Sequence, residues 1–140
     1  MTRKPILIVE ARFYSDISDL LLAGAEDVLK RKNIEFEKLE VPGALEIPAA
    51  IAFTKEQYAA FIALGCVIRG ETTHYETVCN ESARGLMDLS INHGVALANG
   101  ILTCENHAQA LDRADPAKKN KGASFAETAL KMLEIKGLFA

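Results

Sequence analysis

Residues 60–74 read AFIALGCVIRGETTH, an apolar run that passes directly into a polar segment containing a glycine. The run lacks a clean alternation of polar and apolar residues, which is typical of a strand covered on both faces in a parallel sheet. Runs with the same strand character occupy residues 6–9, 36–41 and 95–102. The sequence therefore predicts a parallel sheet of four strands, the third of which covers residues 60–68.

Segments with helical periodicity lie between and after these strands. Over residues 16–32 the apolar side chains fall on one stripe, and Ser15 is placed to cap the start of that helix. The same reasoning predicts further helices over residues 46–55, 74–92, 106–115 and 122–136. The resulting order, βαβαβαβαα, predicts one α/β domain with helices on both faces of the sheet.

Particular residues mark the ends of these predicted helices. Thr73 and Glu76 have the spacing of a capping box, in which each side chain bonds the backbone of the other residue. Asn106 is the expected cap of the fourth helix. Gly94 and Gly137 are the expected terminators of the third and fifth helices.

Composition and charge exclude several classes of protein. Of the 140 residues 49% are hydrophobic and 25% charged, which is the composition of a globular domain and not of a disordered chain. The formal net charge of −3 offers no basic surface for nucleic acid or for an anionic membrane. Charged residues near the N-terminus leave no apolar stretch long enough for a signal peptide. The three cysteines do not have the spacing of metal ligands. We therefore expect a cytoplasmic protein with reduced structural thiols and no metal.

Ligands of open parallel sheets gather beyond the carboxyl ends of the strands. Four segments follow the predicted strands, and we expect them to converge on one edge of the sheet. They are residues 11–14, 42–46, 69–74 and 103–106.

The segment after the third strand has the chemistry of an anion site. Gly70 permits a tight turn, and the amides that follow it lie at the start of a predicted helix, where backbone N–H groups attract negative charge. A plain strand-to-helix turn would explain the glycine equally well. Residues 65–72 have the glycine spacing of a P-loop, but Glu71 stands where a lysine would neutralise the phosphates. The carboxylate argues against a nucleoside triphosphate.

Four side chains near this edge each have a functional and a structural interpretation. His74 occupies the first position of its helix, where the helix dipole disfavours an imidazolium ion, so it is either a proton-transfer group or a packing residue. The planar guanidinium of Arg113 either binds a phosphate through two hydrogen bonds or donates to the last carbonyls of its own helix. Phe13 stacks on a planar ligand or closes the core. Glu46 accepts hydrogen bonds from a ligand, or it complements the start of a helix.

Five collinear segments give the chain a resemblance to a known family. They are residues 11–13, 41–48, 65–74, 100–106 and 120–122. In these segments the chain resembles the lumazine synthases (6,7-dimethyl-8-ribityllumazine synthases), and the match spans nearly all of residues 1–140, read as a single domain. The resemblance implies a flavodoxin-like three-layer sandwich with a four-stranded parallel sheet.

The activity that the resemblance implies is a transferase reaction of riboflavin biosynthesis. In this family 5-amino-6-(D-ribitylamino)uracil condenses with 3,4-dihydroxy-2-butanone 4-phosphate, and the products are the lumazine, inorganic phosphate and water. The reaction needs neither a metal nor an organic cofactor.

The resemblance also implies roles for individual residues. His74 would transfer protons, and Phe13 would stack on the pyrimidine ring. Glu71 and Thr72 would bind the phosphate through their amides, together with Arg113. The residues that would surround the pyrimidine substrate are Ala44, Leu45, Glu46, Cys66, Val67, Ile68 and Lys121, with Glu46 on the ribityl hydroxyls.

Members of this family place the site between neighbouring subunits of a pentamer. Asn99, Arg113 and Lys121 would therefore come from the adjacent chain, and Asn99 replaces the phenylalanine that many relatives carry. Whether pentamers assemble further is left open.

Three other interpretations concern proteins of the same fold class. A phosphate-switched receiver needs an aspartate at the end of the third strand, where this chain has Ile68, Arg69 and Gly70. A flavodoxin needs a hydroxyl-rich loop after the first strand, which residues 11–13 are not. A non-catalytic riboflavin-binding, lumazine-binding or scaffold paralogue remains open, although the presence of both His74 and Arg113 disfavours it.

Overall fold

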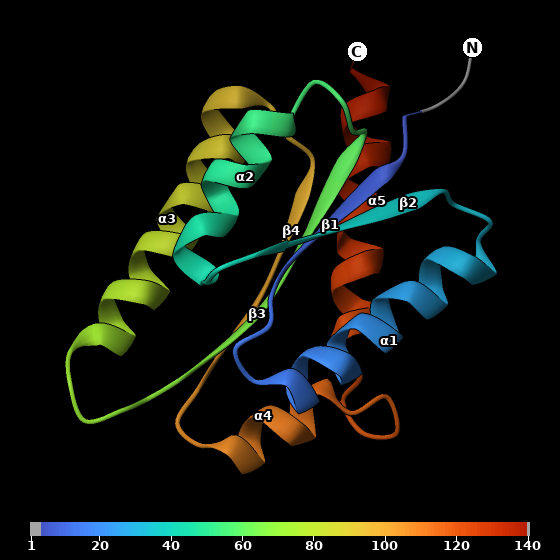
Figure 1. Cartoon of the computed structure of the whole chain (residues 1–140). Coiled ribbons are helices and arrows are strands. Elements are labelled where there is room, and N and C mark those ends of the chain that lie inside the picture. The colour runs from blue at the N-terminus through green and yellow to red at the C-terminus, as the bar shows by residue number, and fades with distance from the viewer. Residues whose placement is uncertain (1–3, 140) are drawn as a thin grey trace.

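The computed structural model describes residues 4–139, which form a parallel sheet between two layers of helices (Figure 1). Residues 1–3, part of the segment tested above for a signal, and Ala140, the end of the predicted domain, lie outside the described residues. The elements in chain order are β1 (Ile6–Ala11), α1 (Ser15–Arg31), β2 (Phe36–Val41), the short 3₁₀ helix η1 (Ala44–Glu46), α2 (Ile47–Thr54), β3 (Ala60–Ile68), α3 (His74–His93), β4 (Leu97–Cys104), α4 (His107–Ala114) and α5 (Lys121–Leu138).

The four strands are all parallel and run in the order β2-β1-β3-β4. The chain moves from β1 outward to β2 and then returns to the other side of β1 to form β3. The carboxyl ends of β1 and β3 are therefore the point where the winding direction reverses, which is where ligands bind in doubly wound sheets. The four-stranded parallel sheet predicted from the sequence is confirmed.

Two hydrophobic cores lie on opposite faces of the sheet. Ile8 of β1 packs in the core beneath α1, α4 and α5, whereas its neighbour Val9 packs in the core beneath η1, α2 and α3. Successive side chains of a strand point to opposite faces, so apolar residues at consecutive positions are needed where both faces are covered. This pattern explains the unbroken apolar runs and confirms the three-layer α/β sandwich.

The predicted strand and helix ranges differ from the structure mainly at their ends. β1 extends two residues beyond the predicted range, to Ala11. β4 begins at Leu97 and not at Val95, because the Val95 amide still donates to Leu89 O at 3.2 Å and belongs to the turn that closes α3. α5 continues through Gly137, which was wrongly predicted to end it. Of the glycines in residues 4–139, Gly94 is the one with a positive φ, 63°, and it ends α3 as predicted.

Two of the three predicted side-chain caps do not form. Ser15 is the first residue of α1 and not its cap, and Tyr14, which precedes it, makes no capping hydrogen bond. Thr73 precedes α3 but its side chain makes no capping hydrogen bond, and Glu76, the other half of the predicted capping box, bonds Arg69. Asn106 caps α4 as predicted, since its side chain accepts from the Gln109 amide at 2.9 Å.

Within residues 4–139 every helix is too short or too polar to span a lipid bilayer.

Candidate active site

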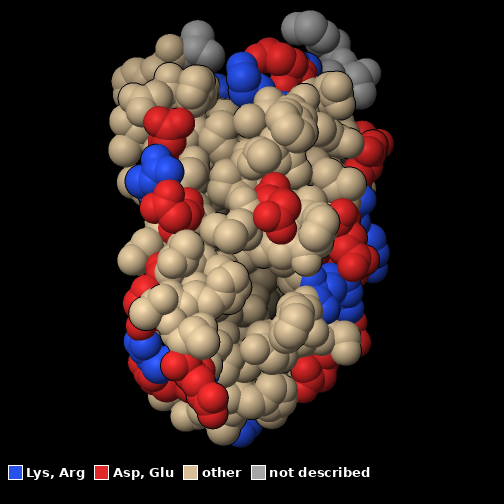
Figure 2. Space-filling view, turned by 60° about the vertical axis from the view of Figure 1, so that its left-hand side comes forward, with Lys and Arg blue, Asp and Glu red and all other residues tan. Residues whose placement is uncertain are grey.

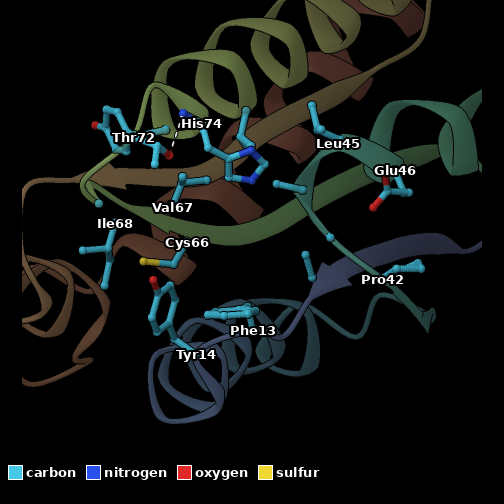
Figure 3. Close-up of a pocket in the computed structure, with 16 residues that line it drawn as sticks. Phe13, Tyr14, Pro42, Leu45, Glu46, Cys66, Val67, Ile68, Thr72 and His74 are labelled. Atoms are coloured by element: carbon cyan, nitrogen blue, oxygen red, sulfur yellow. Dashed lines mark hydrogen bonds between the residues drawn. The ribbon is translucent and has the colours of Figure 1, made fainter.

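A cavity of about 370 Å³ opens at the carboxyl ends of β1 and β3 (Figure 3). This is the reversal point of the sheet, where the topology favours a ligand site. Figure 2 shows a hollowed face of the molecule whose centre is mostly free of charged side chains. The four predicted loop segments contribute unequally: the segments after β1, β2 and β3 line the cavity, whereas residues 103–106 after β4 do not.

Nine of the thirteen residues that the resemblance assigned to the site line this one cavity. They come from three places: the loop after β1, the helix η1, and the end of β3 with the loop and helix that follow. The nine are Phe13, Ala44, Leu45, Glu46, Cys66, Val67, Ile68, Thr72 and His74.

Phe13 is an aromatic ring held at the edge of the cavity. It is 82% exposed, and the ring of Tyr14 meets its edge at a centroid distance of 4.9 Å. A ring this exposed does not pack in the hydrophobic core, so the interpretation that Phe13 closes the core is wrong. An exposed ring fixed by a neighbouring ring is suited to stacking on a planar ligand.

The loop after β3 presents unpaired backbone donors. Between Gly70 and Thr73 the amide N–H groups donate to no acceptor in residues 4–139. Glu71, Thr72 and Thr73 are exposed, and the loop leads into the first turn of α3, a helix of 20 residues. Free amides at the positive end of a helix dipole bind anions. Glu71 does not line the cavity with its side chain, but its amide belongs to this set of donors.

His74 is the first residue of α3, and its ring points into the cavity (Figure 3). Its backbone amide donates to Thr72 Oγ1 at 3.3 Å, which ties the backbone of His74 to the loop of free donors. The histidine and the loop of unpaired amides are therefore adjacent at the cavity.

Cys66 lies on the floor of the cavity at the end of β3. Burial raises the pKa of its thiol to about 12, and the nearby thiol of Cys104 acts in the same direction. A thiol with so high a pKa is neutral and a poor nucleophile. The structure therefore gives Cys66 no thiolate chemistry in this cavity. All three cysteines are free.

Three predicted residues stand apart from the cavity of their own chain. Asn99 lies within β4, where its side chain accepts from the Ile101 amide at 3.1 Å. Arg113 lies in the last turn of α4 and donates to Gln109 O at 3.1 Å, the structural role that rivalled phosphate binding. Lys121 begins α5. Their contribution to a neighbour's site stays a prediction.

Several residues that line the cavity were given no ligand role from the sequence, and two of them, Tyr75 and Val78, lie outside the loop segments expected at this edge. Tyr14 directly follows Phe13, and Val78 lies one helical turn beyond His74, on the same face of α3. The periodicity of α3 was the available signal for Val78, whereas Tyr14 belongs to the segment 11–14 that was expected at this edge, although no ligand role was assigned to it. The other lining residues without an assigned ligand role are Ala11, Pro42, Gly43, Gly70 and Tyr75.

Fold and site together define a doubly wound α/β protein whose cavity pairs an aromatic surface with a loop of unpaired backbone amides. The chain belongs to the 6,7-dimethyl-8-ribityllumazine synthase family, whose model matches residues 3–137. The 6,7-dimethyl-8-ribityllumazine synthase of Bartonella tribocorum is 53% identical, over 99% of this chain and 95% of the relative. The proteins of that name from Novosphingobium aromaticivorans and Zymomonas mobilis are 55% and 54% identical, each over 93% of this chain and 94% of the relative. The family resemblance drawn from the five segments is confirmed, and with it the expected enzyme class, a transferase of riboflavin biosynthesis.

Proposed function

We propose that the chain is a single domain, residues 1–140, that condenses 5-amino-6-(D-ribitylamino)uracil with 3,4-dihydroxy-2-butanone 4-phosphate to form 6,7-dimethyl-8-ribityllumazine. The observation that carries this proposal is the adjacency of His74 to the unpaired amides of residues 70–73, in a cavity whose opposite edge holds Phe13. The condensation needs a planar ring and a phosphate side by side with a proton carrier between them.

In the proposed complex each ligand has its own part of the cavity. Phe13 stacks on the pyrimidine ring, and the backbone of Cys66, Val67 and Ile68 meets its polar edge. Glu46 accepts hydrogen bonds from the ribityl hydroxyls. The amides of Glu71 and Thr72 hold the phosphate of the second substrate, so that its carbonyl carbon faces the pyrimidine amine.

The chemistry then proceeds through proton transfers at His74. The amine attacks the carbonyl carbon, and loss of water gives an imine. Elimination breaks the carbon–oxygen bond to phosphate, which leaves as inorganic phosphate. Elimination leaves an enol at the carbon that bore the hydroxyl, and this enol tautomerises to a ketone. The ribityl-bearing nitrogen closes the ring on that new carbonyl with loss of a second water. Both substrates carry their own reactivity, so alignment and proton transfer are what the protein contributes.

We also propose that the protein works as a homo-oligomer, a pentamer in which each site takes Asn99, Arg113 and Lys121 from the neighbouring chain. Large apolar side chains on the surface support this assembly, because extensive exposed apolar area marks contact surfaces. Phe53 is 81% exposed and Ile91 is 71% exposed, and Met87 is also exposed.

We propose a cytoplasmic location as well, because three free thiols suit a reducing compartment.

The direct test of the activity is absorbance. Both substrates are mixed with the protein, and lumazine formation is followed against the uncatalysed background and against each substrate alone. We expect a rate well above the background. Tight binding of the pyrimidine without faster lumazine formation would instead identify a non-catalytic paralogue. A native mass from light scattering tests the pentamer separately.

A further inference from the structure

The loop that offers the free amides has little backbone support of its own. Residues 70–73 lie between β3 and α3, and within the described chain their amides have no internal partner. A loop whose donors must stay free for a ligand has to be held by something other than those donors. The first turn of α3 donates to Thr72 and Thr73 at the end of the loop. The side-chain contacts that fix the start of the loop come from Arg69, which directly precedes it.

Arg69 is tied to both sides of the loop. Its backbone amide donates to Cys104 O at 2.9 Å, which continues the β3–β4 pairing past the end of the sheet. Its side-chain Nε donates to Glu105 Oε2 at 2.8 Å, just after β4. Its Nη1 bonds Glu76 in the first turn of α3. The side chain thus reaches from the start of the loop to the helix that ends it.

The guanidinium plane also packs on the helix side of the loop. Its central carbon lies 4.4 Å from the ring centroid of Tyr75, a cation–π distance, and Tyr75 lines the cavity. Tyr75 directly follows His74 on α3. The contact therefore fixes the turn that carries the imidazole as well as the turn that carries the amides.

Glu105, the anchor on the other side, is itself held by α4. Its amide donates to the side chain of Gln109 at 2.8 Å, and Gln109 is hydrogen-bonded to the Asn106 cap. The guanidinium therefore connects the first turn of α3 to the capped start of α4. α4 also carries Arg113.

Arg69 does not have the contacts of a phosphate ligand. Its guanidinium is not among the groups lining the cavity, and two carboxylates already balance its single charge. We propose, on the basis of the proposed function, that Arg69 is a positioning residue that holds the loop 70–73 and His74 in place for the phosphate-bearing substrate. Lysine cannot replace it, because a single ammonium group cannot bond two carboxylates in the guanidinium's geometry and lie flat on a ring at the same time.

The test compares Arg69→Gln with Arg84→Gln. Arg84 is the matched control, an exposed arginine farther along α3 that pairs with Glu81 at 2.6 Å and does not line the cavity. For Arg69→Gln we expect the KM for the butanone phosphate to rise about tenfold while the KM for the pyrimidine changes by less than about twofold. Arg84→Gln should match the parent in both constants. Arg69→Lys should recover less than half of the loss.

Two measurements without turnover separate this inference from the proposed function. One is the calorimetric dissociation constant of inorganic phosphate, which should weaken about tenfold in Arg69→Gln. The other is hydrogen exchange at Thr77, whose amide donates to Thr73 O at 3.3 Å and reports the first turn of α3. We expect faster exchange there in Arg69→Gln and in Glu105→Gln, and not in Arg84→Gln.

Each outcome bears on one proposal. If the parent makes no lumazine, the proposed function fails, while phosphate affinity and exchange still decide the role of Arg69. Unchanged phosphate affinity and unchanged exchange in Arg69→Gln would overturn the positioning role. So would a parallel rise of both KM values with a lowered melting temperature, since that pattern is a general loss of stability. Glu105→Gln removes only the ion pair between Arg69 and Glu105. If Arg69→Gln does not fold, phosphate affinity and hydrogen exchange in Glu105→Gln decide whether Arg69 positions the loop.

Discussion

The imidazole of His74 and that of His107 make a natural comparison, because each histidine is the first residue of a helix. His74 lines the cavity, whereas His107 pairs with Asp16 at 2.8 Å outside it. Replacing His74 by alanine removes the proposed proton carrier but leaves the alignment of the two substrates intact. We expect kcat to fall about 100-fold without reaching the uncatalysed rate, since general acid–base help is typically of that size or larger.

The control for this prediction is His107→Ala, which should keep the kcat of the parent. Steady-state rates at saturating concentrations of both substrates give the comparison. Equal kcat values for His74→Ala and the parent would remove His74 from the mechanism.

The raised pKa of the Cys66 thiol predicts how the stability of the protein changes at alkaline pH. Burial raises the pKa of its thiol to about 12 from a usual value of 9.0. Above pH 9 the unfolded chain therefore releases a proton that the folded chain keeps, so the free energy of unfolding falls as the pH rises. Urea unfolding of the parent and of Cys66→Ser, at about pH 8 and about pH 10, should show a smaller fall in the serine variant. Equal falls in the two proteins would contradict a buried neutral thiol.

At the scale of elements, the close packing of α1 against α5 depends on the absence of a side chain at Gly122. A side chain added at Gly122 would meet Leu21 O at 2.1 Å, so the two helices would have to separate. We expect Gly122→Ala to lower the free energy of unfolding by about 3 kcal/mol, as overpacked core positions do. Chemical denaturation of the two proteins measures this loss.

Gly137 is the matched control in the same helix. No atom lies within 4 Å of a side chain added there, and the residue is inside α5. Gly137→Ala should leave the stability unchanged or raise it by about 0.5–1 kcal/mol, because alanine favours the helix. If both variants lose the same stability, close packing at Gly122 is not the cause.

The sequence predicted those features of the elements that neighbouring residues determine, and it failed where contacts with another element decide. Strand runs and the caps at Asn106 and Gly94 are local signals, and they held. The capping box did not form: the Thr73 side chain makes no cap bond, and the Glu76 carboxylate bonds the guanidinium of Arg69, a charged partner just beyond the end of β3. Gly137 failed as a terminator because a glycine ends a helix by adopting the left-handed conformation, as Gly94 does at φ 63°, whereas Gly137 stays helical and the residue that caps the end of α5, Phe139, has φ −118°.

The cavity was predictable in outline for a different reason. Topology brings the ends of β1 and β3 together, so the loops after them had to meet. Tyr14 lies in the segment 11–14 that was expected at this edge, whereas Val78 lies in the second turn of α3, beyond the expected loop, and no motif pointed to it. The Arg69 contacts join residues 36 positions apart in sequence, and no local pattern reports such a pair.

At the scale of the whole molecule, the proposed sharing of sites between chains has a specific test. His74→Ala and Arg113→Ala chains are produced separately and also co-assembled in equal amounts. Each variant alone should be strongly impaired, and Arg113→Ala should raise the KM for the butanone phosphate. In mixed particles about one site in four combines an intact His74 with an intact Arg113 from the neighbour, so about a quarter of the parent activity should return.

Recovery requires that the two residues serve one site from different chains. If mixed particles are no more active than the average of the two variants, then Arg113 acts within its own chain or not at all. The light-scattering mass of the mixed particles must equal that of the parent for the comparison to hold.

The rings around the cavity have an optical consequence. The chain contains three tyrosines and no tryptophan, and two of the three, Tyr14 and Tyr75, line the cavity wall. Ultraviolet fluorescence of this protein therefore originates mostly beside the bound ligand. A pyrimidine arriving against Phe13 would quench that emission directly, so occupancy is readable in unlabelled protein.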